Sequence, residues 1–145
     1  MSKKCCFFGQ INLGYKIRDR VFGQVYERIE RLIQDGYTHF VFGGWGDFEY
    51  TARIAVISHR QKYPQIKTAY YQASAGNDEK ERRIYDEIIP PIQNRLQNAL
   101  VYRDQAMIAG SDYCIFYVTN KAGDTRKALD YAKNQNKPYI NLADI

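Results

Sequence analysis

The feature that most constrains the fold is the alternation of short apolar runs with segments of helical periodicity. The first run, residues 5–8, is apolar at every position, which is typical of a strand buried on both faces of a parallel sheet. Right-handed crossovers between such strands place helices on both faces, so the pattern predicts an α/β fold. The expected strands are residues 5–8, 39–42, 66–71, 112–118 and 138–142.

The expected helices follow from apolar spacing and from turn residues. Val21, Val25 and Ile29 recur at helical spacing, and Gly36 is typical of a helix stop. The polar segment 73–83 is expected to be a mobile surface loop, and residues 88–91 to interrupt regular structure at two prolines. The expected helices are residues 19–35, 48–61, part of 92–109, and 125–136.

The length of 145 residues predicts one domain, residues 1–145. No apolar run approaches the roughly 20 residues of a membrane span, so we expect no membrane partner. The opening MSKKCCFFG lacks a signal-peptide core, and a cytoplasmic location is therefore expected. Three cysteines at positions 5, 6 and 114 have neither disulfide nor metal spacing, so we expect buried thiols, no metal and no cofactor.

The net charge of +5 at pH 7 raises the chance of an anionic partner only modestly. The basic residues are scattered along the chain, and many alternate with acids. Most are therefore expected on a solvated surface, and nucleic acid is the less favoured partner.

The stretch FVFGGWGDFE, residues 40–49, predicts a strand, a glycine turn and the start of a helix. Asp47 is expected to cap that helix. Such a turn leaves backbone N–H groups unpaired at the positive end of a helix dipole, where a phosphate or carboxylate can bind. The alternative is a tight turn with no ligand.

In a parallel sheet, ligands bind outside the carboxyl ends of the strands, where the strand order reverses. Three loops are expected to share that edge: residues 9–15, 43–48 and 119–125. The sequence therefore predicts a ligand site built from these loops.

Residues 103–125, RDQAMIAGSDYCIFYVTNKAGDT, resemble a segment of the SLOG superfamily, R-x-x-x-M-x-x-x-S-D-x-x-I with a glycine-threonine loop. That superfamily includes the LOG and lysine-decarboxylase-like phosphoribohydrolases, the DprA proteins and a YpsA-like branch. The opening CCFFG and the GGWGDFE turn are most similar to the YpsA-like branch. The resemblance implies a Rossmann-like three-layer sandwich of about five mostly parallel strands. It also implies a small-molecule nucleotide ligand and a homodimer or higher homo-oligomer.

The resemblance also implies roles for residues at the sheet edge. Glycines of the turn after residue 42 would cradle a phosphate, and a second anion-binding turn would lie at residues 123–125. The ligand-binding residues expected are Gly9, Gln10, Gly43, Gly44, Trp45, Gly46, Asp47, Arg103, Gly123, Asp124 and Thr125.

Two of these residues have open alternatives. Arg103 would clamp a phosphate through its guanidinium, or else form a surface ion pair with Asp104 or Glu87. Trp45 would stack on a base or ribose, or else lie as a lid over the following helix.

The sequence departs from its relatives at two places that matter for activity. The LOG enzymes resemble one another in P-G-G-x-G-T-x-x-E, but the loop here reads KAGDTRKA, with Ala128 in place of the glutamate. The remaining candidate catalytic residues, if the chain is an enzyme, are Glu49 and Asp124. The YpsA-like branch favours His-Arg after the first strand, where this chain has Gln10 and Ile11.

Three functions therefore stay open, and the sequence leaves undecided whether the chain is an enzyme. The favoured one is binding of a nucleotide derivative of the ADP-ribose or AMP type, as a sensor or sequestering module without strong catalysis. The second is an N-glycosidic hydrolase or transferase acting on a nucleoside monophosphate. The third is a DprA-like single-stranded nucleic-acid binder, favoured by the basic charge and the abundant tyrosine.

Overall fold

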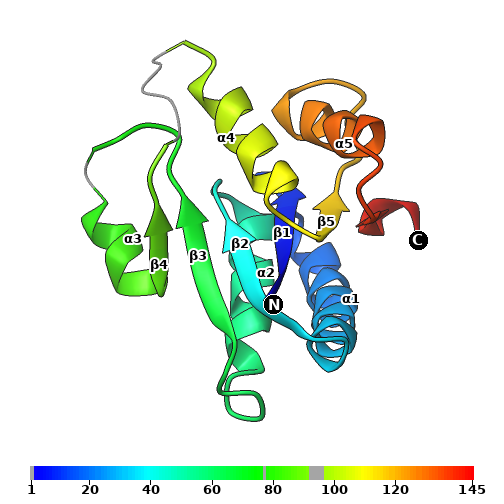
Figure 1. Cartoon of the computed structure of the whole chain (residues 1–145). Helices are drawn as coiled ribbons and strands as arrows, with labels where there is room; N and C mark the ends of the chain where they lie inside the picture. Colours follow the sequence, from blue (N-terminus) through cyan, green and yellow to red (C-terminus); the bar gives the residue numbers. More distant parts are fainter. Residues whose placement is uncertain (1, 77, 92–96) are drawn as a thin grey trace.

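A computed structural model describes residues 2–76, 78–91 and 97–145. Within these residues, six parallel strands form one sheet in the order β4-β3-β2-β1-β5-β6 (Figure 1). The predicted α/β fold with a parallel sheet is confirmed. The strands are β1 (Lys3–Gly9), β2 (Tyr37–Phe42), β3 (Lys67–Tyr71), β4 (Glu87–Ile89), β5 (Tyr113–Tyr117) and β6 (Tyr139–Asn141).

Helices lie on both faces of this sheet (Figure 1). Helices α1 and α2 pack together on one face, and α4 and α5 pack together on the other. No helix of the described ranges is long and apolar enough to cross a membrane. The helices are α1 (Tyr15–Gln34), α2 (Asp47–Ser58), α3 (Glu79–Ile84), α4 (Ala99–Ala109) and α5 (Asp124–Asn134), with a final 3-10 turn at Leu142–Asp144.

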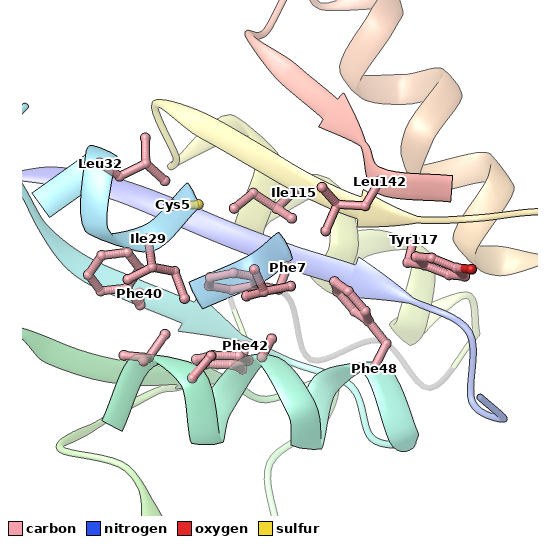
Figure 2. Packing of buried hydrophobic residues seen from close by; sticks show 14 of the residues in the cluster. Cys5, Phe7, Ile29, Leu32, Phe40, Phe42, Phe48, Ile115, Tyr117 and Leu142 are labelled. Carbon is pink, nitrogen blue, oxygen red and sulfur yellow. The ribbon is translucent and has the colours of Figure 1, made fainter. Parts of the chain in front are cut away.

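The apolar run of β1 is continuous because both faces of this strand are buried. Cys5 and Phe7 point into the core under α1 and α2, whereas Cys6 and Phe8 point into the core under α4 and α5. Figure 2 shows the first of these cores, where the ring of Phe7 stacks on Phe42 with 4.8 Å between ring centroids. All three cysteines are buried free thiols, as expected.

Helix α1 begins at Tyr15, four residues before the predicted start at residue 19, so that predicted start is wrong. Gly14 is the N-cap, and its carbonyl accepts hydrogen bonds from the N–H groups of Ile17 and Arg18. The first turn carries exposed polar residues, and its apolar spacing becomes clear only from Val21 onward. Periodicity alone therefore placed the start too late.

The predicted mobile loop at residues 73–83 and the break at 88–91 are also wrong in part. The chain forms α3 within that loop, and β4 follows as a sixth strand instead of the five expected. Asp86 fixes β4 beside β3, because its carboxylate accepts the backbone N–H of Thr68 at 2.8 Å. Pro90 then follows the strand at an edge of the sheet, where a missing N–H is tolerated. Residues 92–96 of the next predicted helix lie outside the described residues, and α4 occupies the remainder.

Two glycine substitutions test the packing at the end of β1. A Cβ at Gly9 would overlap the ring of the fully buried Phe48, whereas a Cβ at exposed Gly23 in α1 would meet no atom within 4 Å. We expect Gly9→Ala to lower the free energy of unfolding by about 1–3 kcal/mol, because the core is overpacked. Gly23→Ala should raise it by about 0.5–1 kcal/mol, because alanine favours the helix.

Chemical denaturation of the two variants and of the native chain measures these changes. Equal stability of Gly9→Ala and the native chain would contradict the close packing of β1 against α2.

Candidate functional site

The candidate site lies at the carboxyl edge of the sheet, where the strand order reverses. Strand β1 has β2 on one side and β5 on the other, so the loops after β1 and β5 diverge to opposite halves of the sheet. This is the position at which open α/β sheets bind ligands. The three predicted loops, residues 9–15, 43–48 and 119–125, all follow the carboxyl ends of parallel strands and therefore share this edge.

A cavity of about 310 Å³ lies between the loops after β1 and β5. We call it the β1–β5 cavity. The carboxamide of Gln10 joins the two loops, because its Oε1 accepts the backbone N–H of Thr119 at 2.7 Å. Polar groups of the lining are neutral amides and a hydroxyl, so the cavity presents hydrogen-bonding groups and no charged side chain. The lining residues are Gln10, Ile11, Asn12, Val118, Asn120, Ala122, Gly123 and Thr125.

The start of α5 faces this cavity with unpaired backbone donors. Gly123 is the N-cap, with φ of 100°, and Asp124 is the first residue of the helix. Within the described part of the chain, no acceptor pairs with the backbone N–H groups of Asp124, Thr125 or Arg126. Unpaired N–H groups at the positive end of a helix dipole attract an anion, and here they adjoin a cavity at the reversal of strand order.

The start of α2 differs, because its first backbone donors are already paired. The N–H of Asp47 donates to the carbonyl of Ile11 at 2.7 Å, and the N–H of Phe48 donates to the carbonyl of Gln10 at 3.3 Å. The N-cap is Gly46, with φ of 118°, and a Cβ on it would lie 2.7 Å from the Cα of Ile11. The expected unpaired N–H groups at this turn are therefore absent at Asp47 and Phe48.

Asp47 is the first residue of α2 and not its N-cap, so the prediction that Asp47 caps this helix is wrong. Its carboxylate accepts the backbone N–H of Leu13 at 2.8 Å and pairs with Arg18 at 2.8 Å. The Leu13 N–H and then the Arg18 guanidinium lower the pKa of Asp47, although partial desolvation opposes them. Asp47 therefore fixes the loop after β1 to both helices.

Glu49 is a buried carboxyl beneath the glycine turn. The backbone N–H groups of Gly44 and Gly43 lie near this carboxyl, while its Oε2 has no hydrogen-bond partner within the described residues. Only 6% of the surface of Glu49 is exposed. Burial raises the pKa of Glu49 to about 8, against the opposing effects of Arg103 and the two glycine N–H groups. The carboxyl is therefore largely neutral at pH 7.

Arg103 reaches the glycine turn from α4, because its Nη1 donates to the carbonyl of Gly43. Its Nη2 also lies 3.0 Å from Oδ1 of Asp104, and the two side chains are 12% and 10% exposed. The ion pair with Asp104 that the sequence left open is therefore present, but it is largely buried. Burial raises the pKa of Asp104, although Arg103 opposes this.

A second cavity, of about 400 Å³, lies between α2, α3 and β3. We call it the α2–α3 cavity. Trp45 lies at its rim with 73% of its surface exposed, so it does not form a packed lid over α2. The lining residues are Gly44, Trp45, Gly46, Asp47, Glu49, Tyr50, Arg53, Tyr70, Lys80, Glu81, Ile84 and Tyr85.

Most of the predicted ligand-binding residues line one or the other of these two cavities. Gln10, Gly123 and Thr125 line the β1–β5 cavity. Gly44, Trp45, Gly46, Asp47 and the candidate acid Glu49 line the α2–α3 cavity. Four others line neither cavity: Gly9, Gly43, Arg103 and Asp124.

Sequence reasoning missed several lining residues. Asn12 and Asn120 follow β1 and β5 within a few residues of the strand ends, so their position in the predicted loops could have indicated them. Tyr70 and Tyr85 reach the α2–α3 cavity from β3 and from the end of α3. The contribution of Tyr85 depends on α3, which the sequence did not predict.

No protein-family model matches the chain, and no curated protein matches it. Several chains of solved structures do match, among them the following two. DNA processing protein A from Helicobacter pylori, described for a unique single-stranded DNA binding mode, aligns with a TM-score of 0.65 at 15% identity, over 94% of this chain and 63% of that chain. DNA processing protein A (DprA) from Streptococcus pneumoniae aligns with a TM-score of 0.67 at 10% identity, over 95% and 49%.

The chain shares the Rossmann-like α/β fold of these structures. It spans 63% and 49% of their lengths, and identities this low show likeness of fold alone. The Rossmann-like fold that the sequence resemblance implied is therefore confirmed.

The raised pKa of Glu49 predicts a pH-dependent stability. Between pH 4.5 and 8 the unfolded chain ionises Glu49 while the folded chain keeps the proton, so stability falls as pH rises. We expect the free energy of unfolding to decrease relative to Glu49→Gln by at most about 1.4 kcal/mol per pH unit in this window. Above pH 8 the difference should become constant.

Parallel denaturation of the native chain and Glu49→Gln from pH 5 to 9 measures the effect. A stability difference that is the same at every pH would show that the Glu49 carboxyl titrates normally in the folded chain.

Proposed function

We propose that this chain binds a nucleotide derivative through its phosphate, which lies in the β1–β5 cavity against the start of α5. The observation that carries the proposal is the set of unpaired backbone N–H groups at Asp124, Thr125 and Arg126 beside this cavity. A phosphate oxygen accepts such donors and interacts favourably with the helix dipole.

The neighbouring groups support a phosphate ester rather than a simple anion. The cavity of about 310 Å³ has room beyond one phosphate group, and Gln10, Asn12 and Asn120 offer hydrogen bonds to sugar hydroxyls. The resemblance to the YpsA-like branch of the SLOG superfamily agrees with a nucleotide ligand.

Binding without strong catalysis is the favoured form of this function. Ala128, which stands where the LOG enzymes carry a glutamate, is buried in the core beneath α5. No carboxylate therefore projects from that position toward the cavity. Release of free base from a bound nucleoside monophosphate would instead indicate the hydrolase alternative.

The variant Thr125→Glu tests the phosphate site. A carboxylate in the first turn of α5 is compatible with the helix dipole, but it repels a phosphate bound to the same N–H groups. We expect AMP and ribose 5-phosphate to stabilise the native chain against heat. The affinity for both should fall at least tenfold in Thr125→Glu.

The matched control is Gln65→Glu, which adds the same charge at an exposed position before β3, at the opposite edge of the sheet. It should bind both ligands as the native chain does. Equal losses in the two variants would indicate a general charge effect, and absence of stabilisation of the native chain by either ligand would contradict the proposal.

Single-stranded DNA is a second candidate ligand, and two observations favour it. The solved structures of similar fold include a protein described for its single-stranded DNA binding mode. In addition, the most exposed aromatic side chains of the described residues lie at the same edge: Tyr15, Trp45 and Tyr50 are 77%, 73% and 59% exposed. Exposed aromatics beside basic residues such as Arg18 and Arg53 are typical of surfaces on which unpaired bases stack.

Trp45 is the single tryptophan of the chain, so its fluorescence reports ligands at this edge. If the ligand is single-stranded DNA, an oligothymidylate should quench Trp45 with an affinity that falls steeply with salt concentration. A free nucleotide as ligand predicts saturation by AMP and weak oligonucleotide binding. Quenching by the oligonucleotide that is independent of salt would count against a nucleic-acid surface.

A further inference from the structure

The α2–α3 cavity differs from the β1–β5 cavity in the kind of side chain that lines it. Four aromatic residues line the cavity, Trp45 and Tyr50 from the region of α2, and Tyr70 and Tyr85 from the sheet and from beyond α3. Tyr70 and Tyr85 pack against each other, with 5.1 Å between their ring centroids. Flat apolar rings around a cavity of about 400 Å³ suit a planar heterocycle.

Glu49 supplies the polar group of this cavity. It is 6% exposed, lines the cavity, and has an Oε2 atom without a hydrogen-bond partner in the described residues. The N–H groups of Gly44 and Gly43 lie near enough to this carboxyl to lower its pKa. The carboxyl therefore keeps hydrogen-bonding capacity that no described residue uses at Oε2. A buried polar atom without a partner destabilises the fold, and a ligand can relieve that cost.

Resting on the proposed phosphate site, we propose that the α2–α3 cavity holds the base of the bound nucleotide. The protonated carboxyl of Glu49 donates a hydrogen bond to an acceptor atom on the edge of that base. Ring nitrogens and exocyclic oxygens of the nucleobases are such acceptors.

The two cavities are neighbours at the sheet edge, so one ligand can reach both. Gly46 lines the α2–α3 cavity, and Ile11 lines the β1–β5 cavity. A Cβ on Gly46 would lie 2.7 Å from the Cα of Ile11, so the glycine backbone is in direct contact with the loop after β1. A sugar lying over this contact connects a phosphate on one side with a base on the other.

The test measures how the affinity for the ligand changes with pH as Glu49 loses its proton. Burial raises the pKa values of Tyr70 and Tyr85 above the usual range, so both stay neutral near pH 8. The Glu49 carboxyl has a pKa of about 8 and loses its donor proton above that pH. The other charged and titratable groups of the described residues that line this cavity or act on the Glu49 charge come from α2, β3, α3 and its end, and α4: Asp47, Tyr50, Arg53, Tyr70, Lys80, Glu81, Tyr85, Arg103 and Asp104.

The experiment compares ligands with and without a base by calorimetric titration. The 5′-monophosphates of adenosine, guanosine, cytidine and uridine are each measured against ribose 5-phosphate at pH 6.5 and pH 9. We expect at least one nucleotide to bind the native chain at least tenfold more tightly than ribose 5-phosphate at pH 6.5. This gain should shrink at least threefold at pH 9, where Glu49 is ionised.

Two variants separate the roles of the carboxyl and the aromatic rim. In Glu49→Gln the carboxamide still donates but does not titrate, so the gain should be the same at both pH values. The control Glu27→Gln makes the same change at an exposed position of α1 and should keep the native pH dependence. Trp45→Ala should lower the gain without altering the affinity for ribose 5-phosphate, and exposed Trp45 can be removed without loss of the fold.

The outcomes distinguish the two proposals. If ribose 5-phosphate and all four nucleotides bind equally, the base pocket is overturned while the phosphate site stands. A native pH dependence retained in Glu49→Gln overturns the role of Glu49. If neither ribose 5-phosphate nor any nucleotide binds, the proposed function itself fails.

Discussion

The contact between the loop after β1 and the start of α2 decides which parts of the sheet edge can receive a ligand. The carbonyls of Gln10 and Ile11 accept the first two N–H groups of α2, and Gly46 allows the two backbones to touch. Two donors of the first turn of α2 are consequently satisfied within the chain. The equivalent donors at the start of α5 have no partner among the described residues, and they border the β1–β5 cavity. The same contact separates that cavity from the α2–α3 cavity.

A group of buried ionisable side chains supports the glycine turn from below. Arg103 donates to the carbonyl of Gly43 and pairs with Asp104, while the carboxyl of Glu49 lies near the N–H groups of Gly44 and Gly43. Backbone groups of the turn that interact with these side chains are not available to bind a phosphate. The turn that dominates the sequence lines the α2–α3 cavity, and the Glu49 carboxyl beneath it has spare hydrogen-bonding capacity among the described residues.

Much of the fold could be predicted because its determinants are local. The apolar run at β1 and the glycine stop after α1 each depend on adjacent residues, and both predictions held. Strand β4 could not be predicted, because three residues before two prolines acquire their pairing only from β3 and from Asp86. The cap predicted at Asp47 failed for a related reason, because the preceding Gly46 takes the cap position itself.

The shared edge of the three loops could be predicted from the sequence, but the pairing of their backbone N–H groups could not. Parallel strands bring their carboxyl ends together, so the three loops could be assigned to one edge from the sequence. Whether a backbone N–H is free depends on what lies opposite it in the folded chain. The pairing of Asp47 and Phe48 with the loop after β1 is a tertiary contact between residues more than 30 positions apart, and no local pattern encodes it.

The most direct test of this account is a titration of the isotope-labelled chain with ribose 5-phosphate, followed by backbone amide resonances in NMR spectra. The account predicts saturable shifts at the amides of Asp124, Thr125 and Arg126, because these donors are unpaired. It predicts small shifts at Asp47 and Phe48, whose N–H groups are already hydrogen-bonded. Shifts concentrated on the glycine turn and the start of α2, with none at the start of α5, would contradict it.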